Sequence, residues 1–63
     1  MNNQYSIYRQ LRSYNVPALI ALRANRWYIK KTGWEKKGIL VTCLCIVRRY
    51  NPSAWRTAKI IGF

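Results

Sequence analysis

Charge is the feature that most constrains what this chain can fold into. Its 63 residues hold twelve lysine and arginine side chains but only one carboxylate side chain, Glu35, and the formal net charge is +11. Like charges at this density repel one another in a compact state, and a chain of this length buries only about 60% of the surface that it exposes when unfolded. The sequence therefore predicts one small basic domain over residues 1–63 that is stabilised by an anionic partner.

Apolar side chains still favour a folded domain over a disordered one. They make up 51% of the chain and include three Trp and five Tyr, which is more than a disordered chain usually carries. The longest nearly unbroken apolar stretch, residues 39–47, is too short for a bilayer-spanning helix of about 20 residues. Residues 1–20 show no basic start followed by an apolar run and a cleavage site, so we expect a cytoplasmic protein.

The residue types leave little room for catalysis. General acid–base chemistry near neutral pH calls for a His, a perturbed carboxylate, a Lys or a thiol held by partners, and this chain has no His and no Asp. Cys43 and Cys45 lie one residue apart, where an internal disulfide is sterically poor, and the chain lacks the ligands for a four-coordinate metal site. We expect no enzyme, no metal and no cofactor, and two buried thiols that pack as small apolar side chains.

Two similar corners divide the chain. Residues 12–19, Arg-Ser-Tyr-Asn-Val-Pro-Ala-Leu, are echoed one residue shorter by residues 48–55, Arg-Arg-Tyr-Asn-Pro-Ser-Ala-Trp. Asn closes helices in the left-handed conformation and also caps their starts, and Pro fits the first turn of a helix. The pattern predicts an all-α fold of two short helix–Asn–Pro–helix hairpins. The expected helices cover residues 5–14, 17–31, 33–50 and 52–61.

The third of these segments has two interpretations. Thr32 and Glu35 have the spacing of a capping box, which favours a helix. Residues 39–47, however, are apolar on every face and rich in β-branched side chains, as in a buried strand. The alternative is an α+β fold with N-terminal helices and a small antiparallel β-hairpin whose strand lies at about 39–47. In the last segment, three side chains are expected to face the core: Trp55, Ala58 and Ile61.

The basic residues form the candidate binding surface. In the helix predicted over residues 17–31, Arg23, Arg26 and Lys30 fall on one stripe, with Ala21, Ala24 and Tyr28 on the opposite side. Seven of the twelve cations are Arg, whose planar guanidinium suits phosphate, and aromatic residues are interleaved with them. We expect contacts to nucleic acid from Arg23, Arg26, Lys30, Lys31, Lys36, Lys37, Arg48 and Arg49, with aromatic contacts from Trp27 and Trp55.

One segment has a likeness among known proteins. Residues 8–24, Tyr-Arg-Gln-Leu-Arg-Ser-Tyr-Asn-Val-Pro-Ala-Leu-Ile-Ala-Leu-Arg-Ala, resemble a pattern in very small basic accessory proteins of lambdoid phages and prophages. In that pattern an Arg-rich helix ends at an aromatic and a turn residue and restarts with an Ala-Leu-Arg-Ala-like helix. Asn15 stands where Gly is expected. The resemblance implies a bacterial or phage setting and carries no mechanism.

Together these features predict a small non-catalytic protein of phage or prophage type that binds nucleic acid, DNA or RNA. Binding would use a basic helical surface and be largely independent of base sequence. One alternative is an effector that docks on an acidic surface of a host protein. The other is a cationic membrane-active peptide or toxin in which residues 39–47 insert into an anionic bilayer. An oligomer is a further option, because a second copy of the chain would cover the all-apolar segment.

Overall fold

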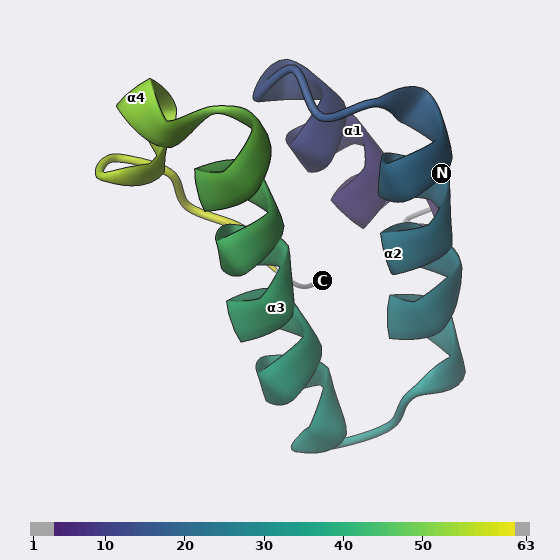
Figure 1. The fold of residues 1–63 in the computed structure, drawn as a ribbon. Coiled ribbons are helices and arrows are strands. Elements are labelled where there is room, and N and C mark those ends of the chain that lie inside the picture. The colour runs from purple at the N-terminus through teal and green to yellow at the C-terminus, as the bar shows by residue number, and fades with distance from the viewer. Residues whose placement is uncertain (1–3, 62–63) are drawn as a thin grey trace.

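The chain forms four α-helices, α1 (Ser6–Ser13), α2 (Ala18–Lys30), α3 (Glu35–Tyr50) and α4 (Pro52–Trp55) (Figure 1). This computed structural model describes residues 4–61, and no strand occurs among them. The predicted all-α class is therefore confirmed, and the alternative with a strand at residues 39–47 is wrong. Those residues form the middle of α3 because burial of Ile39, Cys43 and Val47 follows the helical period, and such packing outweighs β propensity.

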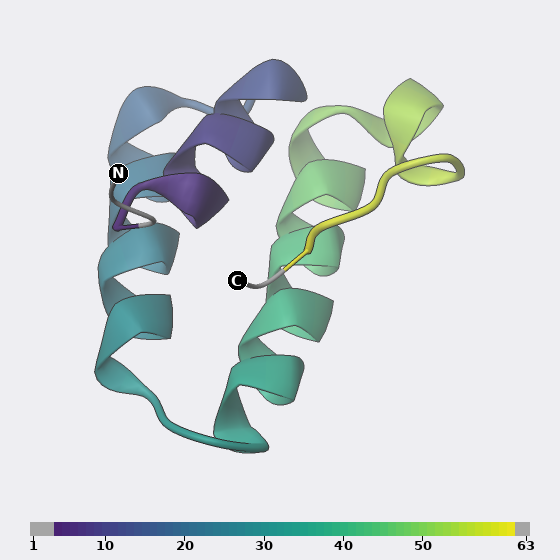
Figure 2. The same ribbon diagram turned by 180° about the vertical axis from the view of Figure 1, so that it is seen from behind.

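The helices form two layers. Helices α2 and α3 run antiparallel as a hairpin, and α1 together with the segment that follows α4 covers one face of it (Figures 1 and 2). The other face of the hairpin, called the front face here, is turned toward the viewer in Figure 1. The core lies between the layers and contains Ile7, Leu11, Val16, Ala21, Ala24, Tyr28, Ile39, Cys43, Val47 and Ile60.

The corner between α1 and α2 is a Schellman motif. Asn15 has φ 64°, which is the left-handed, helix-closing conformation, one of the two roles expected for Asn at the corners. The Val16 N–H donates to the Leu11 carbonyl (3.1 Å) and the Asn15 N–H to the Arg12 carbonyl (3.0 Å), the two hydrogen bonds that define the motif. Leu11 and Val16 are both fully buried, so the motif also supplies a core contact.

The corner between α3 and α4 repeats the sequence of the first corner without its geometry. Asn51 has φ −148° and serves both as the C-cap of α3 and as the N-cap of α4. Its Nδ2 donates to the Tyr14 carbonyl at 2.9 Å, so the two corners are joined. Pro52 occupies the first turn of α4, as predicted. The two corners therefore share residue types but form two different turns.

The last helix is much shorter than predicted. It ends at Trp55, and residues 58–61 run back along the molecule without helical structure. Side chains of α1 supply the backbone partners that a helix would otherwise provide. The Tyr14 hydroxyl accepts from the Lys59 N–H (3.0 Å), and the Gln10 side-chain amide pairs with both the N–H and the carbonyl of Ile61 (2.7 Å each).

This change of conformation alters which side chains are buried. Ile60 is in the core, whereas Ile61, which was expected there, is 55% exposed. Trp55 was also expected inside but is 37% exposed, and Ala58 is half-buried. Ala58 packs against the core as expected. The prediction for Ile61 failed because it assumed a helical period, whereas hydrogen bonds from Gln10 and Tyr14 hold residues 59–61 in a non-helical course.

The capping box predicted at the start of α3 does not form. Gly33 has φ 55°, and the helix begins after a cap residue, Trp34, that makes no side-chain hydrogen bond. The Glu35 N–H instead donates to the backbone carbonyl of Thr32 (3.2 Å). A glycine-centred backbone turn, which needs the left-handed conformation, therefore takes the place of the side-chain cap.

Asn25 of α2 is a polar side chain buried within the core. Its Oδ1 accepts from the Tyr8 N–H at 3.0 Å, in the first turn of α1, where N–H groups have no partner within the helix. Its Nδ2 donates to the Gln4 carbonyl. The cap residue of α1, Tyr5, makes no side-chain cap of its own, so a residue of the next helix caps α1 and aligns the two.

We expect Asn25→Ala to lower the free energy of unfolding by about 1–3 kcal/mol, because the buried partners of the amide are left without hydrogen bonds. Urea unfolding followed by circular dichroism measures the change. Leu19→Ala is the matched control, because Leu19 lies in the same helix and is 75% exposed. An equal loss in the two variants would contradict the role given to Asn25.

The two cysteines lie in different environments. Cys43 is fully buried, and burial raises the pKa of its thiol to about 11. Cys45 is exposed, because residues two apart point to nearly opposite sides of a helix. The expectation of two buried thiols is confirmed for Cys43 and wrong for Cys45.

We expect a thiol reagent to modify Cys45 alone in the native protein and both cysteines after unfolding. The unfolded Cys43 thiol ionises near its ordinary pKa of roughly 8.5, below the folded value of about 11. Its contribution to stability is therefore complete below pH ~8.5 and is lost as the pH rises toward 11. Mass spectrometry gives the modified residue, and Cys43→Ala should remove this part of the alkaline destabilisation. Rapid native modification of Cys43 would contradict the expectation.

Candidate nucleic-acid interface

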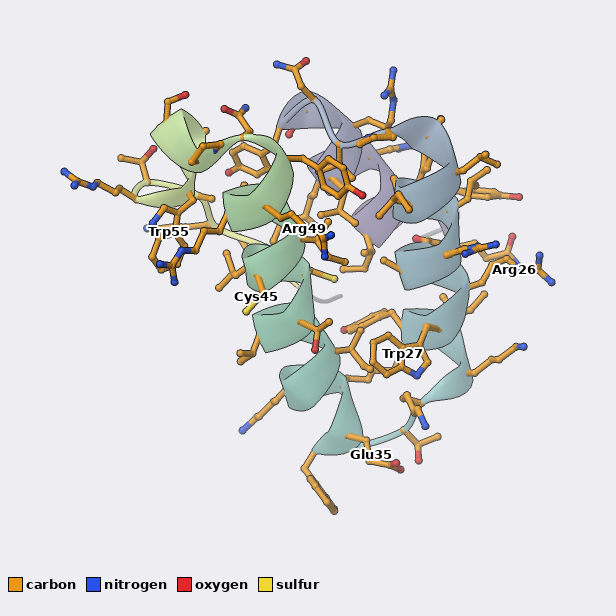
Figure 3. All side chains as sticks on the ribbon, in the orientation of Figure 1. Arg26, Trp27, Glu35, Cys45, Arg49 and Trp55 are labelled. Carbon is orange, nitrogen blue, oxygen red and sulfur yellow. The ribbon has the colours of Figure 1, made fainter. Side chains whose placement is uncertain are left out.

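The basic stripe predicted on the second helix exists in the structure. Arg23, Arg26 and Lys30 are exposed along α2, opposite its buried residues, which include Ala21 and Tyr28. Figure 3 shows Arg26 pointing away from α3. The outer side of α2 is therefore a cationic surface, called the α2 stripe below.

A shallow apolar pocket opens on the α2–α3 hairpin and is called the front pocket below. It has a volume of about 300 Å³. Trp27 is 44% exposed, and Figure 3 shows it on the front face between the two helices. Arg23 belongs both to this pocket and to the α2 stripe. The lining residues are Ile20, Arg23, Ala24 and Trp27 of α2 and Ile46 of α3.

Arg49 places a second guanidinium on the same face. It lies three residues after Ile46 on α3, so the two side chains share one side of the helix. Arg49 is exposed, and in Figure 3 it projects from α3 on the face that also carries Trp27. Basic side chains from two helices, Arg23 and Arg49, therefore lie on the face that also carries the exposed Trp27, and Arg23 lines the front pocket with it (Figure 3).

Two of the predicted contact residues stack on aromatic rings. The Lys36 ammonium lies 4.9 Å from the centroid of the Tyr28 ring, and the Arg48 guanidinium lies 5.1 Å from the centroid of the Trp55 ring. Both are cation–π contacts, which the sequence analysis did not foresee. Each contact holds one positive charge over the face of an aromatic ring, one near the start and one near the end of α3.

The remaining predicted residues lie outside the front pocket. Lys31 is half-buried and forms the C-cap of α2, and Lys37 is exposed in the first turns of α3. Figure 3 shows Trp55 and Trp27 on opposite sides of α3. The two tryptophans predicted as aromatic contacts therefore do not form one platform. Trp34, which was not predicted as a contact, is 81% exposed.

The one carboxylate side chain of the protein lies far from Arg49 along α3. Glu35 occupies the first turn of α3, where the helix dipole favours a negative charge, and Figure 3 shows Arg49 at the other end of that helix. At about 1.5 Å per residue, the two are roughly 20 Å apart along the axis, well beyond the Debye length of about 8 Å at physiological salt. Glu35 therefore leaves the charge of Arg49 uncompensated.

Three residues of the front pocket, Ile20, Ala24 and Ile46, were not predicted as contacts by the sequence analysis. Arg23 and Trp27 lie one turn apart on one helix, so their spacing could have predicted that this cation and this ring lie side by side. No comparable signal pairs α2 with Ile46, because that contact depends on how the two helices are aligned.

The described residues hold neither a metal site nor a membrane-spanning helix. Within residues 4–61, no three side chains of the types that ligate metals come together, and none of the described helices is both long and apolar enough to cross a bilayer. No family model, curated protein or solved structure matches this chain. The function is therefore inferred from the chemistry of the exposed residues.

Proposed function

We propose that this protein binds nucleic acid in the cytoplasm, using the α2 stripe and the front face of the hairpin. The observation that carries the proposal is that Arg23 and Arg49, from two different helices, lie on the same face as an exposed Trp27 (Figure 3). Guanidinium groups make strong, directional hydrogen bonds to phosphate, and an exposed aromatic ring beside them offers a stacking surface. A small accessory protein of phage or prophage type is a setting that fits this activity.

The binding we propose depends mainly on the phosphate backbone. Lysine and arginine side chains that neutralise phosphates release condensed counterions, which supplies most of the affinity of proteins that bind without sequence preference. Contacts to phosphate position a protein on nucleic acid but carry no base information. We therefore propose that binding is largely independent of base sequence.

Insertion of residues 39–47 into a bilayer has less support than this proposal. Three of the apolar side chains in that segment, Ile39, Cys43 and Val47, are part of the core, so insertion would expose the remainder of the core to water or lipid. The acidic-protein alternative uses the same cationic surface, and binding to acidic proteins but not to nucleic acid would favour it.

A titration over several salt concentrations tests the proposal. If about six phosphates are contacted, the logarithm of the binding constant for duplex DNA should fall against the logarithm of salt concentration with a slope near −5. Fluorescence anisotropy of a labelled duplex measures the constant. A slope near zero, or binding to acidic proteins or anionic vesicles but not to nucleic acid, would contradict the proposal.

We expect the double variant Arg26→Gln/Lys30→Gln to reduce the magnitude of this slope by about 2, because each lost phosphate contact contributes about 0.9. The matched control is Arg9→Gln/Arg56→Gln, which removes the same charge. Arg9 and Arg56 are exposed on α1 and beyond α4, outside the proposed surface. If both double variants reduce the slope equally, binding follows net charge and the α2 stripe has no special part.

A further inference from the structure

We infer that the front pocket binds an unpaired nucleobase, so that the preferred ligand is single-stranded nucleic acid. This inference rests on the proposed function and names its substrate class. A binding surface made only of the α2 stripe would require nothing but phosphates. The front pocket adds an apolar recess and an aromatic ring, and neither has a use in contacting a phosphate.

The chemistry of the front pocket suits a flat heteroaromatic ring. Ile20, Ala24 and Ile46 make its walls apolar, and Trp27 presents nearly half of its surface, 44%, to solvent. The volume of about 300 Å³ lies at the lower limit of small-molecule pockets, which span roughly 300–1,000 Å³. Stacking of a base on an aromatic side chain is tolerant of sequence because every base has a π-face.

The charges around the front pocket suit the backbone on either side of such a base. Arg23 forms part of the wall, and Arg49 stands on the facing helix on the same side of the molecule (Figure 3). A base between α2 and α3 would leave its flanking phosphates near these two guanidinium groups, which hold phosphate well. Glu35 lies at the other end of α3 from Arg49 and leaves the charge of that guanidinium uncompensated (Figure 3).

An unpaired base fits this arrangement better than a paired one. In a duplex the bases are stacked inside the helix, and a base reaches a protein pocket only after it is unpaired and flipped out, at an energetic cost that is smallest in single strands. A duplex can still lie on the α2 stripe through its phosphates. Only a single strand can use the stripe and the front pocket together without this cost.

The fold does not depend on the Trp27 ring. Trp27 is absent from the buried core and from the half-buried apolar side chains that pack against it. The core residues of α2 are Ala21, Ala24 and Tyr28, with Ile20 packed against this core. Trp27 can therefore be replaced with little effect on folding, which makes the inference open to a direct test.

The first experiment compares labelled oligothymidine with a duplex of equal length. Trp27→Leu should weaken binding to the single strand by about 5- to 150-fold, which is the effect of losing one base–aromatic stack. Binding to the duplex should change by less than about twofold, since phosphate contacts alone carry it. Trp27→Phe keeps an aromatic ring and should retain most of the affinity for the single strand.

Trp34→Leu is the matched control, because Trp34 is the more exposed tryptophan, at 81%, and takes no part in the front pocket. It should leave both affinities unchanged. Circular dichroism and urea unfolding of each variant report whether the fold is kept.

The second experiment removes the base instead of the ring. A single strand with abasic sites has the same length and charge, so the wild-type protein should bind it as weakly as Trp27→Leu binds the intact strand. Trp27→Leu should bind the intact and abasic strands equally. Equal loss of single-strand and duplex binding in Trp27→Leu, or wild-type binding that ignores the abasic sites, would overturn the inference but leave the proposed function standing. Absence of binding to any nucleic acid at low salt would overturn the proposed function itself.

Discussion

The fold depends on neutral hydrogen bonds between side chains and backbone that tie its two layers together. A chain with one carboxylate side chain and twelve cations cannot hold its helices with a network of ion pairs. Asn25 instead joins α2 to the start of α1, Asn51 joins the second corner to the first, and Gln10 and Tyr14 of the first hairpin hold the segment after α4. The side-chain amides and the tyrosine hydroxyl pair with backbone groups without adding charge. The interior between the two layers therefore stays neutral, and the repulsion between cations is confined to the protein surface.

These ties also decide which face of the protein is open. They bring α1 and residues 58–61 onto one face of the α2–α3 hairpin, so the front face and the outer side of α2 stay accessible. The cations cannot be neutralised from within, and cation–π contacts hold two of them, Lys36 and Arg48, against rings. Arg23 lines the front pocket, and Arg49 lies on the same face (Figure 3). The same division into a covered face and an open face thus gives the protein both its core and its proposed binding surface.

Local patterns predicted several features correctly. Closing a helix in the left-handed conformation was one of the two roles expected for Asn15, and its φ of 64° shows that it takes this role. The helical period placed Arg23, Arg26 and Lys30 opposite the buried side of α2. Errors arose where partners distant in the sequence compete with local preference. Gln10 and Tyr14 draw residues 59–61 away from a helix, Gly33 starts α3 by a backbone turn in place of the capping box, and Cys45 lies on the side of α3 that no element of the described chain covers.

The sequence by itself favoured the helical class and determined the charge and the stripes on single helices, because these depend on residue type and on spacing within a few turns; the structure then removed the strand alternative for residues 39–47. Only the tertiary structure decided that Trp27 and Arg23 meet Ile46 in one pocket, that Arg49 lies on the same face, and that Trp55 lies apart with Arg48 (Figure 3). The physical reason is that the alignment of α2 with α3 is set by core packing and by hydrogen bonds from other segments. No periodicity within either helix contains that information.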